Sequence, residues 1–544
     1  MSSMVYVANR VHTMTGVDDG DANAVLVRDG RIAAVGRAED LTQVDGVNVV
    51  DFGGGVITPG LNDSHSHAIS GAISDALGLD LTGALSIDAV RGRLESYVDT
   101  VPDGEWILAW GLDPTIYEGG PLVFKPFADI IGNRPALINF ADQHSLLASP
   151  AALQAAGITG AVDFPNSSAS IACYEDGTPT GHVLEFEATA MVRAAMPPLS
   201  DEQKMRNIAE VLNGMAASGL TGSHVMDLSP EHLQLLRSLE EREDLGIKLR
   251  LHPFVDPIAL DDVDREYDYL RGLVGQQGRR WAVTGVKFFM DGSIDGGTAW
   301  LQHPDVHGDS DHGAWSDQAA YKALMHRLVA DGVSTVTHAI GDGGVLVHER
   351  VVRDLMAEFH DVNGGAHGTH SIEHLEMLDD EAVREVAGSG VYLSMMPLHC
   401  TRFLRADHTD NWSRKLGDPR DDMSFRTHSL LEAGATIAIG SDWPVAPYDP
   451  RWTMADGVLR RPFDQPDVAP IEPEEAMTAE QLLYGYTVAC AEARGERGVS
   501  GRLAPGYVAD LTVFGDDPLS VPAESLGSIL VLATVVDGEL SYQA

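Results

Sequence analysis

A repeated alternation of helix and strand constrains the fold of this chain more than any other feature. In four places a helical segment ends in a cluster of small residues and glycine, and a β-branched strand follows directly. The clusters are Ala217-Ser218-Gly219, Ala330-Asp331-Gly332, Gly388-Ser389-Gly390 and Glu432-Ala433-Gly434. Glycine just past a helix end relieves the left-handed conformation required there. Strands that alternate with helices in this way pair in parallel.

About eight strands follow from this pattern, which predicts a (β/α)8 barrel, an α/β fold with helices outside the strands. The predicted strands lie near residues 56–61, 220–225, 249–254, 283–289, 333–338, 367–372, 391–395 and 436–439. A doubly wound open sheet is the alternative architecture for the same alternation.

The two ends of the chain and one internal segment depart from the alternation. Both ends carry short β segments with Asp-Gly hairpin turns, at Asp29-Gly30 and Asp537-Gly538. Because each piece would be marginal alone, we expect residues 1–58 and 500–544 to form one small β-sandwich. The barrel is predicted for residues 59–72 and 199–499. Residues 73–198 are rich in Gly, Pro and Asp and follow the first barrel strand, which predicts an inserted lid and substrate domain.

The charge of the chain limits its partners. Lysine and arginine number 37 and aspartate and glutamate 81, a net charge of −44. This composition argues against nucleic acid and anionic membranes as partners. The expected partner is a small-molecule substrate. Three distant cysteines, no signal-peptide pattern and no long apolar run predict a cytoplasmic protein. The oligomeric state stays open, with a homodimer as one option.

His65 and His67 suggest a metal site. They lie one residue apart after a short apolar run, and alternate residues of a strand point to the same face. Both imidazoles can therefore reach one point, and neutral imidazole is a common ligand of zinc and related metals. The same pattern also occurs by chance, so it needs support from elsewhere in the chain.

Such support comes from the carboxyl ends of other predicted strands. Residues at these ends converge in a barrel, and they include His338, His374 and Asp442. Taken singly, each histidine could be a hydrogen-bonded structural residue and Asp442 a helix cap. Taken together, they predict a site for one or two divalent ions, with Zn²⁺ favoured and iron or manganese as alternatives.

Lys287 lies within an otherwise apolar predicted strand. It could extend its ammonium group to the surface. If it is buried, an unpaired charge would cost several kcal/mol, and a lowered pKa is one resolution. The resulting neutral amine can take up CO₂ as a carbamate, an anionic ligand able to bridge two metal ions.

Several motifs together resemble a known family. They are Ile57 to Gly60 running into Asp63 to His67, Asp142 to Ser145 with Ser149, Gly181 to Glu185, Val286 to Phe288 with Asp291 to Ser293, His338 to Asp342, Ile372 to His374, Gly440 to Val445, and Gly506 to Leu511. With these motifs the chain resembles the amidohydrolase superfamily, and within it the YtcJ-like metal-dependent hydrolases of amidohydrolase family 3. That group includes N-substituted formamide deformylase.

The resemblance implies roles for individual residues. His65, His67 and Asp442 would hold one metal ion, and His338 and His374 a second, with carbamylated Lys287 bridging them. Glu185 matches a family glutamate that is either a metal neighbour or a substrate contact. Further candidates for substrate contact are His144, Asp291 and Trp443, although Trp443 could instead pack at the barrel rim.

These observations favour an enzyme acting on carbon–nitrogen bonds other than peptide bonds. The expected reaction is hydrolysis of an amide, an N-substituted formamide or a cyclic amide by metal-bound hydroxide, with Asp442 as general base and acid. An ester or carbamate hydrolase, an isomerase or a lyase could use the same site. A metal-stabilised regulatory protein without catalysis is a further alternative.

Overall fold

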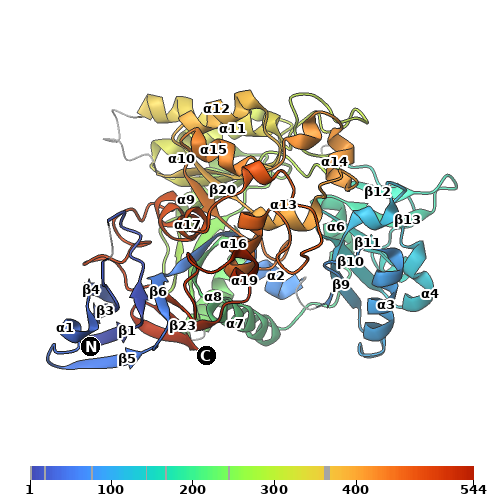
Figure 1. The fold of residues 1–544 in the computed structure, drawn as a ribbon. Helices are drawn as coiled ribbons and strands as arrows, with labels where there is room; N and C mark the ends of the chain where they lie inside the picture. Colours follow the sequence, from blue (N-terminus) through green and yellow to red (C-terminus); the bar gives the residue numbers. More distant parts are fainter. Residues whose placement is uncertain are drawn as a thin grey trace.

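The computed structural model describes residues 3–17, 20–74, 78–142, 144–165, 168–242, 245–359 and 368–544. Figure 1 shows the arrangement: helices surround central strands, the two termini lie in one β region, and the segment after the first central strands projects to the opposite side. Among the described residues, none of the helices combines the length and apolar character that crossing a membrane requires.

Two parallel sheets form the central part of the chain. The first has the order β16-β15-β14-β7. It comprises β7 (Leu61–Ser66), β14 (Leu220–Leu228), β15 (Lys248–Pro253) and β16 (Trp281–Val283). The second has the order β17-β18-β19-β20-β21. It comprises β17 (Gly285–Phe289), β18 (Ser334–Ala339), β19 (His370–His374), β20 (Tyr392–Met395) and β21 (Ile437–Ile439).

The two sheets meet at isolated bridges. Phe254, just after β15, pairs with Lys287 of β17, and Ser66 of β7 pairs with Trp443, just after β21. This arrangement is a TIM-barrel-like α/β fold. It differs from the predicted barrel in one respect, because the ladder of hydrogen bonds in the described part of the chain is interrupted at both junctions.

The helices follow the predicted pattern. Helix α7 (Asp201–Ala217) begins with a capping box between Ser200 and Gln203, which satisfies two backbone donors at the helix start. Helices α10 (Gln318–Ala330), α11 (Asp342–Phe359) and α12 (Asp380–Gly388) each bury one apolar side. After α7 and α10, Gly219 and Gly332 have φ angles of 102° and 71°, as expected for residues that end a helix in the left-handed region.

Two predicted strands are divided. Residues 56–61 belong partly to β6 (Val56–Pro59) of a terminal sheet and partly to β7, and the break falls at Gly60. A Cβ at Gly60 would lie 2.4 Å from Thr221 Oγ1, so only glycine fits this close approach between neighbouring segments. Residues 283–289 likewise divide between β16 and β17 at Thr284. In the strand predicted for 367–372, residue 367 lies outside the described residues.

Both ends of the chain contribute to two sheets on one side of the molecule (Figure 1). One sheet, in the order β4-β3-β1-β5, contains β1 (Ser3–Val7), β3 (Ala24–Arg28), β4 (Arg31–Gly36) and β5 (Val47–Asp51). The other, in the order β2-β6-β22-β23-β24, joins β2 (Arg10–Val11) and β6 to β22 (Leu511–Phe514), β23 (Val531–Val536) and β24 (Glu539–Gln543). Tyr6, Ile57 and Val513 lie in one buried cluster, so side chains from both ends share a core.

The inserted segment forms a six-stranded sheet of its own. Its order is β12-β13-β11-β10-β9-β8, and the strands are β8 (Leu79–Asp80), β9 (Ile107–Leu112), β10 (Ala136–Phe140), β11 (Ser145–Ala148), β12 (Ser170–Cys173) and β13 (Pro179–Leu184). The same segment contains helix α3 (Ile87–Val98), and helix α6 (Phe186–Arg193) follows directly after β13. It has separate apolar clusters, one around Phe127 and Ile138 and one around Leu146 and Val183.

Candidate metal centre

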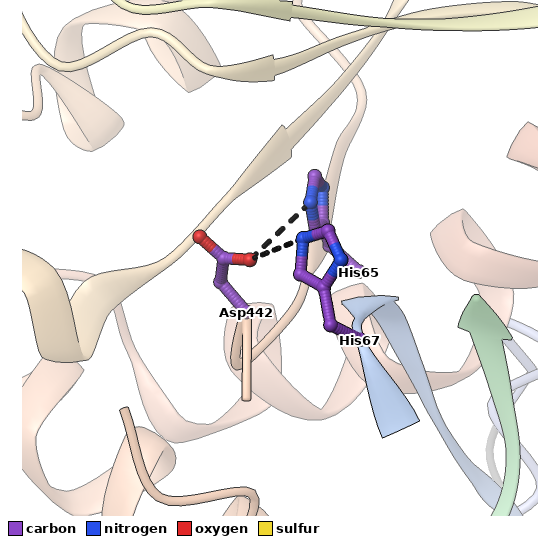
Figure 2. A group of neighbouring side chains, drawn as sticks. All are labelled: His65, His67 and Asp442. Carbon is purple, nitrogen blue, oxygen red and sulfur yellow. Dashed lines mark ion pairs between the residues drawn. The ribbon is translucent and has the colours of Figure 1, made fainter. Parts of the chain in front are cut away.

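His65 and His67 both face Asp442 from the end of β7 (Figure 2). Their Nε2 atoms lie 3.4 Å and 3.3 Å from Asp442 Oδ1. Ser66, between them, points elsewhere, and its Oγ is 2.6 Å from that of Ser223. The three ligand atoms lie within 4.8 Å of one another. The structure therefore brings together the three residues predicted for one metal ion.

A buried carboxylate holds this group in place. Asp63 accepts hydrogen bonds from Ser441 Oγ at 2.5 Å and from the backbone N–H groups of Ser441 and His65 at 3.0 Å and 3.1 Å. The backbone N–H of Asp442 donates to His65 O at 2.7 Å. These bonds fix the ends of β7 and β21 relative to each other, although Asp442 itself adopts a left-handed φ of 57°. Such conformations persist where the surrounding contacts enforce them.

A second group of histidines faces the other carboxylate oxygen of Asp442, Oδ2. His374 Nδ1, at the end of β19, and His399 Nε2, in helix α13 (Pro397–Phe403), are each 3.8 Å from Asp442 Oδ2. His338, predicted to share the second ion with His374, has its ring 4.3 Å from that of His374. Its Nε2 faces the carbonyl oxygen of Gly292 at 3.3 Å. The geometry thus groups His399, which sequence reasoning missed, with His374, and places His338 beside them.

Several buried atoms of this region have no hydrogen-bond partner among the described residues. They are His65 Nε2, His374 Nδ1 and Nε2, His399 Nε2, Asp442 Oδ1 and Lys287 Nζ. Leaving a buried polar atom unsatisfied costs about 1–3 kcal/mol. A bound divalent ion would satisfy the nitrogen and oxygen atoms together, and such a mixed set fits zinc.

The protonation of these groups suits metal binding. Burial lowers the pKa values of His65, His338 and His374 well below their ordinary value, and Lys287 lowers them further. Burial also lowers the pKa of Lys287 to about 8, although Glu373, Asp442 and Asp227 oppose the shift. His65, His338 and His374 are therefore neutral, as metal ligands must be. Burial disfavours the charged form of His67 as well, but Asp227 and Asp442 raise its pKa to about 10, so this ring would lose a proton on binding a metal ion. The lowered pKa of Lys287 makes the neutral amine easier to reach than in an exposed lysine.

Two carboxylates orient the histidines of β7. Glu373 Oε2 lies 2.7 Å from His65 Nδ1, and Ser371 Oγ donates to Glu373 Oε1 at 2.5 Å. Asp227 Oδ2 lies 2.8 Å from His67 Nδ1. With the proton on Nδ1, each ring presents Nε2 to a metal ion. Burial raises the pKa of Glu373 to about 7, with Lys287 opposing the shift.

The inserted segment reaches the centre through Glu185. Its Oε2 lies 3.2 Å from His144 Nδ1, and Thr298 Oγ1 donates to its Oε1 at 2.7 Å. The ring of His144 is 5.7 Å from that of His338. Burial opposes protonation of His144, but Glu185 and Asp142 raise its pKa to about 9. Glu185 therefore links the insert to the barrel beside the candidate ligands, and it belongs to neither ligand group found among the described histidines and carboxylates at this centre.

The structure gives no support for substrate contact by Asp291 or Trp443. Asp291 is fully buried and accepts backbone N–H groups from Trp300, Ile340 and Gly341 at 2.8–2.9 Å, so its carboxylate holds loops together. Trp443 packs on helix α2 (Ala68–Ser74), where a Cβ at Gly71 would lie 2.7 Å from its Cζ3. This position agrees with the alternative of packing at the rim.

A cavity of about 400 Å³ opens on the centre. His67, Lys287, His338, His374 and Asp442 line one part of it. Apolar side chains line another part: Phe186 of the insert together with Met226, Phe254, Phe289 and Val445. The lining also includes the charged residues Arg193 and Asp227. The arrangement can hold a small molecule that has an apolar group and a polar bond close to the candidate ligands.

Comparisons with known proteins identify the family of the chain. Residues 48–542 match the model of the amidohydrolase family. The chain is 28% identical to YtcJ of Bacillus subtilis (strain 168), over 98% of each chain. It is 24% identical to the N-substituted formamide deformylase of Arthrobacter pascens, covering 96% of this chain and 95% of that one.

A solved structure shows the same fold. It is an uncharacterised metal-dependent hydrolase of Pyrococcus horikoshii, with a TM-score of 0.70 at 22% identity, covering 96% of this chain and 99% of that chain. The family match spans most of the chain and confirms the resemblance drawn from the sequence motifs. This chain therefore belongs to the amidohydrolase family.

Proposed function

We propose that this protein is a metal-dependent hydrolase that cleaves a C–N bond in an amide, an N-substituted formamide or a cyclic amide. One observation carries the proposal: His65 and His67, at the end of β7, and Asp442, which follows β21, converge on one point, and His67 and Asp442 line a 400 Å³ cavity. Similarity to an N-substituted formamide deformylase supports the choice of bond.

His65, His67 and Asp442 would hold one ion, and His374 with His399 or His338 a second. Lys287, as a carbamate, would contribute a bridging ligand from β17. A divalent ion there, with zinc favoured by the mixed ligands, would polarise the substrate carbonyl and lower the pKa of a bound water toward about 7.

Asp442 is the proposed proton carrier. Its carboxylate lies between the two histidine groups, where it can accept the proton of the attacking water and return it to the leaving nitrogen. Glu373 and Asp227 would keep the rings of His65 and His67 in the ligand-competent tautomer. The inserted segment would act as a lid, since Phe186, at the start of α6, lines the cavity while 48% exposed.

The test is Asp442→Asn, assayed on amide, formamide, ester and carbamate analogues with the zinc-loaded protein. We expect the wild type to release amine from an amide or a formamide, and the variant to lose turnover by at least about 10²-fold. Circular dichroism establishes that the variant is folded, and Asp103→Asn, which removes an exposed carboxylate, serves as the matched control.

Near-normal kcat in Asp442→Asn would rule out Asp442 as the proton carrier. Turnover of the ester or carbamate alone, or rearrangement without hydrolysis, would favour the alternative reactions. A purified protein that holds no metal and turns over none of the analogues would favour a regulatory role.

A further inference from the structure

We propose that the substrate carries a protonated amine on a short chain, and that this amine binds in an acidic, aromatic chamber beside the metal centre. The inference rests on the proposed hydrolytic function, because it names the class of substrate on which that site acts. We call this space the amine chamber and define it by Asp142, Asp295, Glu376, Phe403, Trp412 and Phe425.

The amine chamber adjoins the candidate metal ligands. It has a volume of about 60 Å³, and its lining also includes His374, His399 and Asp442. Six residues line both this chamber and the 400 Å³ cavity: Asp142, His144, His338, His374, Asp442 and Val445. A substrate bond at the ligands would therefore lie next to both spaces.

Three carboxylates of the chamber accept hydrogen bonds from neutral donors, and one of them, Glu376, also has His399 Nδ1 at 3.5 Å from its Oε1. Ser293 Oγ donates to Asp142 at 3.3 Å, and Asn411 Nδ2 donates to Asp295 at 3.2 Å. Trp412 Nε1 donates to Glu376 at 3.1 Å. Among the described residues, the lining of the chamber contains no lysine or arginine. A fourth carboxylate, Asp113, is paired with Arg405 at 3.0 Å.

The carboxylates repel one another. Burial raises the pKa of Asp295 well above its ordinary value, and Asp142, Glu376 and Asp410 raise it further. His144, whose pKa Glu185 and Asp142 raise, is the positive group at one side of the chamber. A ligand cation between Asp142, Asp295 and Glu376 would relieve this repulsion.

The other walls are suited to the same ligand. Phe403, Trp412 and Phe425 contribute aromatic side chains, and aromatic faces attract ammonium groups. His374, His399 and Asp442, the candidate metal ligands, form the wall that adjoins the metal centre. The chamber thus combines aromatic walls, carboxylates and metal-ligand candidates in one small space.

The volumes of the two spaces indicate which part of the substrate each can hold. A cavity needs a volume of about 10–15 Å³ to hold one water molecule. The chamber, at 60 Å³, therefore accommodates a group of only a few heavy atoms, such as an aminoethyl chain. The apolar remainder would lie in the 400 Å³ cavity against Phe186, Phe254 and Phe289. The net charge of −44 would also attract a cationic substrate more than a neutral one.

Isosteric amides test the proposal with zinc-loaded protein. One pair is N-(2-aminoethyl)-2-phenylacetamide and N-propyl-2-phenylacetamide, with the ammonium group on the leaving amine. The other is glycine benzylamide and propionic acid benzylamide, with the ammonium group on the acyl side. We expect kcat/KM to be at least tenfold higher for the cationic member of one pair than for its neutral partner. This ratio should decrease at high salt, which screens the attraction between charges. Equal or better turnover of both neutral members would overturn the proposal.

Asp295→Asn should reduce the cationic preference to less than threefold, whereas the exposed change Asp103→Asn should leave it intact. Glu376→Gln provides a second variant, and circular dichroism establishes that each is folded. A preference that persists in both folded chamber variants would place the amine elsewhere and refute the assignment.

A binding measurement separates this proposal from the hydrolytic function. Calorimetric titration compares propylammonium with propanol on the zinc-loaded protein. If no amide is cleaved but propylammonium binds and Asp295→Asn abolishes binding, the result supports the amine chamber and refutes the amide-cleaving function. If amides are cleaved but the protein neither binds propylammonium nor prefers a cationic amide, the result supports the hydrolytic function and refutes the assignment of the amine chamber.

Discussion

Replacing Glu373 should weaken zinc binding through His65 without removing a metal ligand. Glu373 and His65 are each 1% exposed, and their side chains meet at 2.7 Å. Water cannot readily replace this bond, so the expected loss reflects orientation of the imidazole. Removing such a partner lowers metal affinity about 10- to 100-fold, which corresponds to about 1.4–2.7 kcal/mol.

The structure predicts a different loss of zinc affinity for each of two substitutions at Glu373. In Glu373→Gln the amide oxygen can still accept from His65 Nδ1, while the amide nitrogen can donate to Ser371 Oγ, which now accepts. The dissociation constant should rise about tenfold. In Glu373→Ala neither bond can form, and the rise should reach about 100-fold. Competition with a zinc-binding dye measures both values.

Glu349→Gln is the matched control. Glu349 is also fully buried, but it lies on α11 and pairs with Arg353 at 3.0 Å, away from the metal centre. Its zinc affinity should stay within twofold of the wild type even if the protein is destabilised. Unchanged affinity in Glu373→Ala would refute the reasoning that this carboxylate sets the tautomer of His65.

Three further predictions concern stability. Burial lowers the pKa of Lys287 from 10.5 to about 8, so the unfolded chain retains a proton that the folded one loses between these values. Lys287→Met should therefore stabilise metal-free protein by up to about 3 kcal/mol below pH 8, and the gain should vanish by pH 10.5 in urea denaturation. Gly71→Ala, whose Cβ would meet Trp443, should cost about 1–3 kcal/mol, whereas Gly92→Ala in α3, with open space around it, should gain up to about 1 kcal/mol. Zinc at 100 times its dissociation constant should add about 2.7 kcal/mol to the unfolding free energy, and a chelator should reverse the gain.

Local periodicity predicted much of the site. The i, i+2 spacing of His65 and His67 indicated one shared face, and both Nε2 atoms lie on the same oxygen of Asp442. An apolar strand around Lys287 indicated a buried amine, and the structure buries it. These features depend on strand geometry and burial, which a sequence pattern records directly.

Other features depend on contacts between distant segments. Glu373 meets His65 across 308 residues, and Asp227 meets His67 across 160, so nothing in their local sequence marks them as partners. His399 was missed because it lies in a helix rather than at a strand end. The sequence Met395-Met396-Pro397 carried the available signal, since it marks a strand that turns into a helix at the same mouth of the barrel.

The pairing of β6 with β22 has a consequence for biosynthesis. Thr512 accepts a bond from the backbone of Leu61 through its hydroxyl and lies opposite Thr58, 454 positions earlier. The strand β6, which leads into β7 and the two histidines at its end, therefore pairs with β22 only after the intervening segment of the chain has been synthesised. Such long-range closure is slow, and during translation the first strand before the catalytic region remains an unpaired edge that a chaperone could protect.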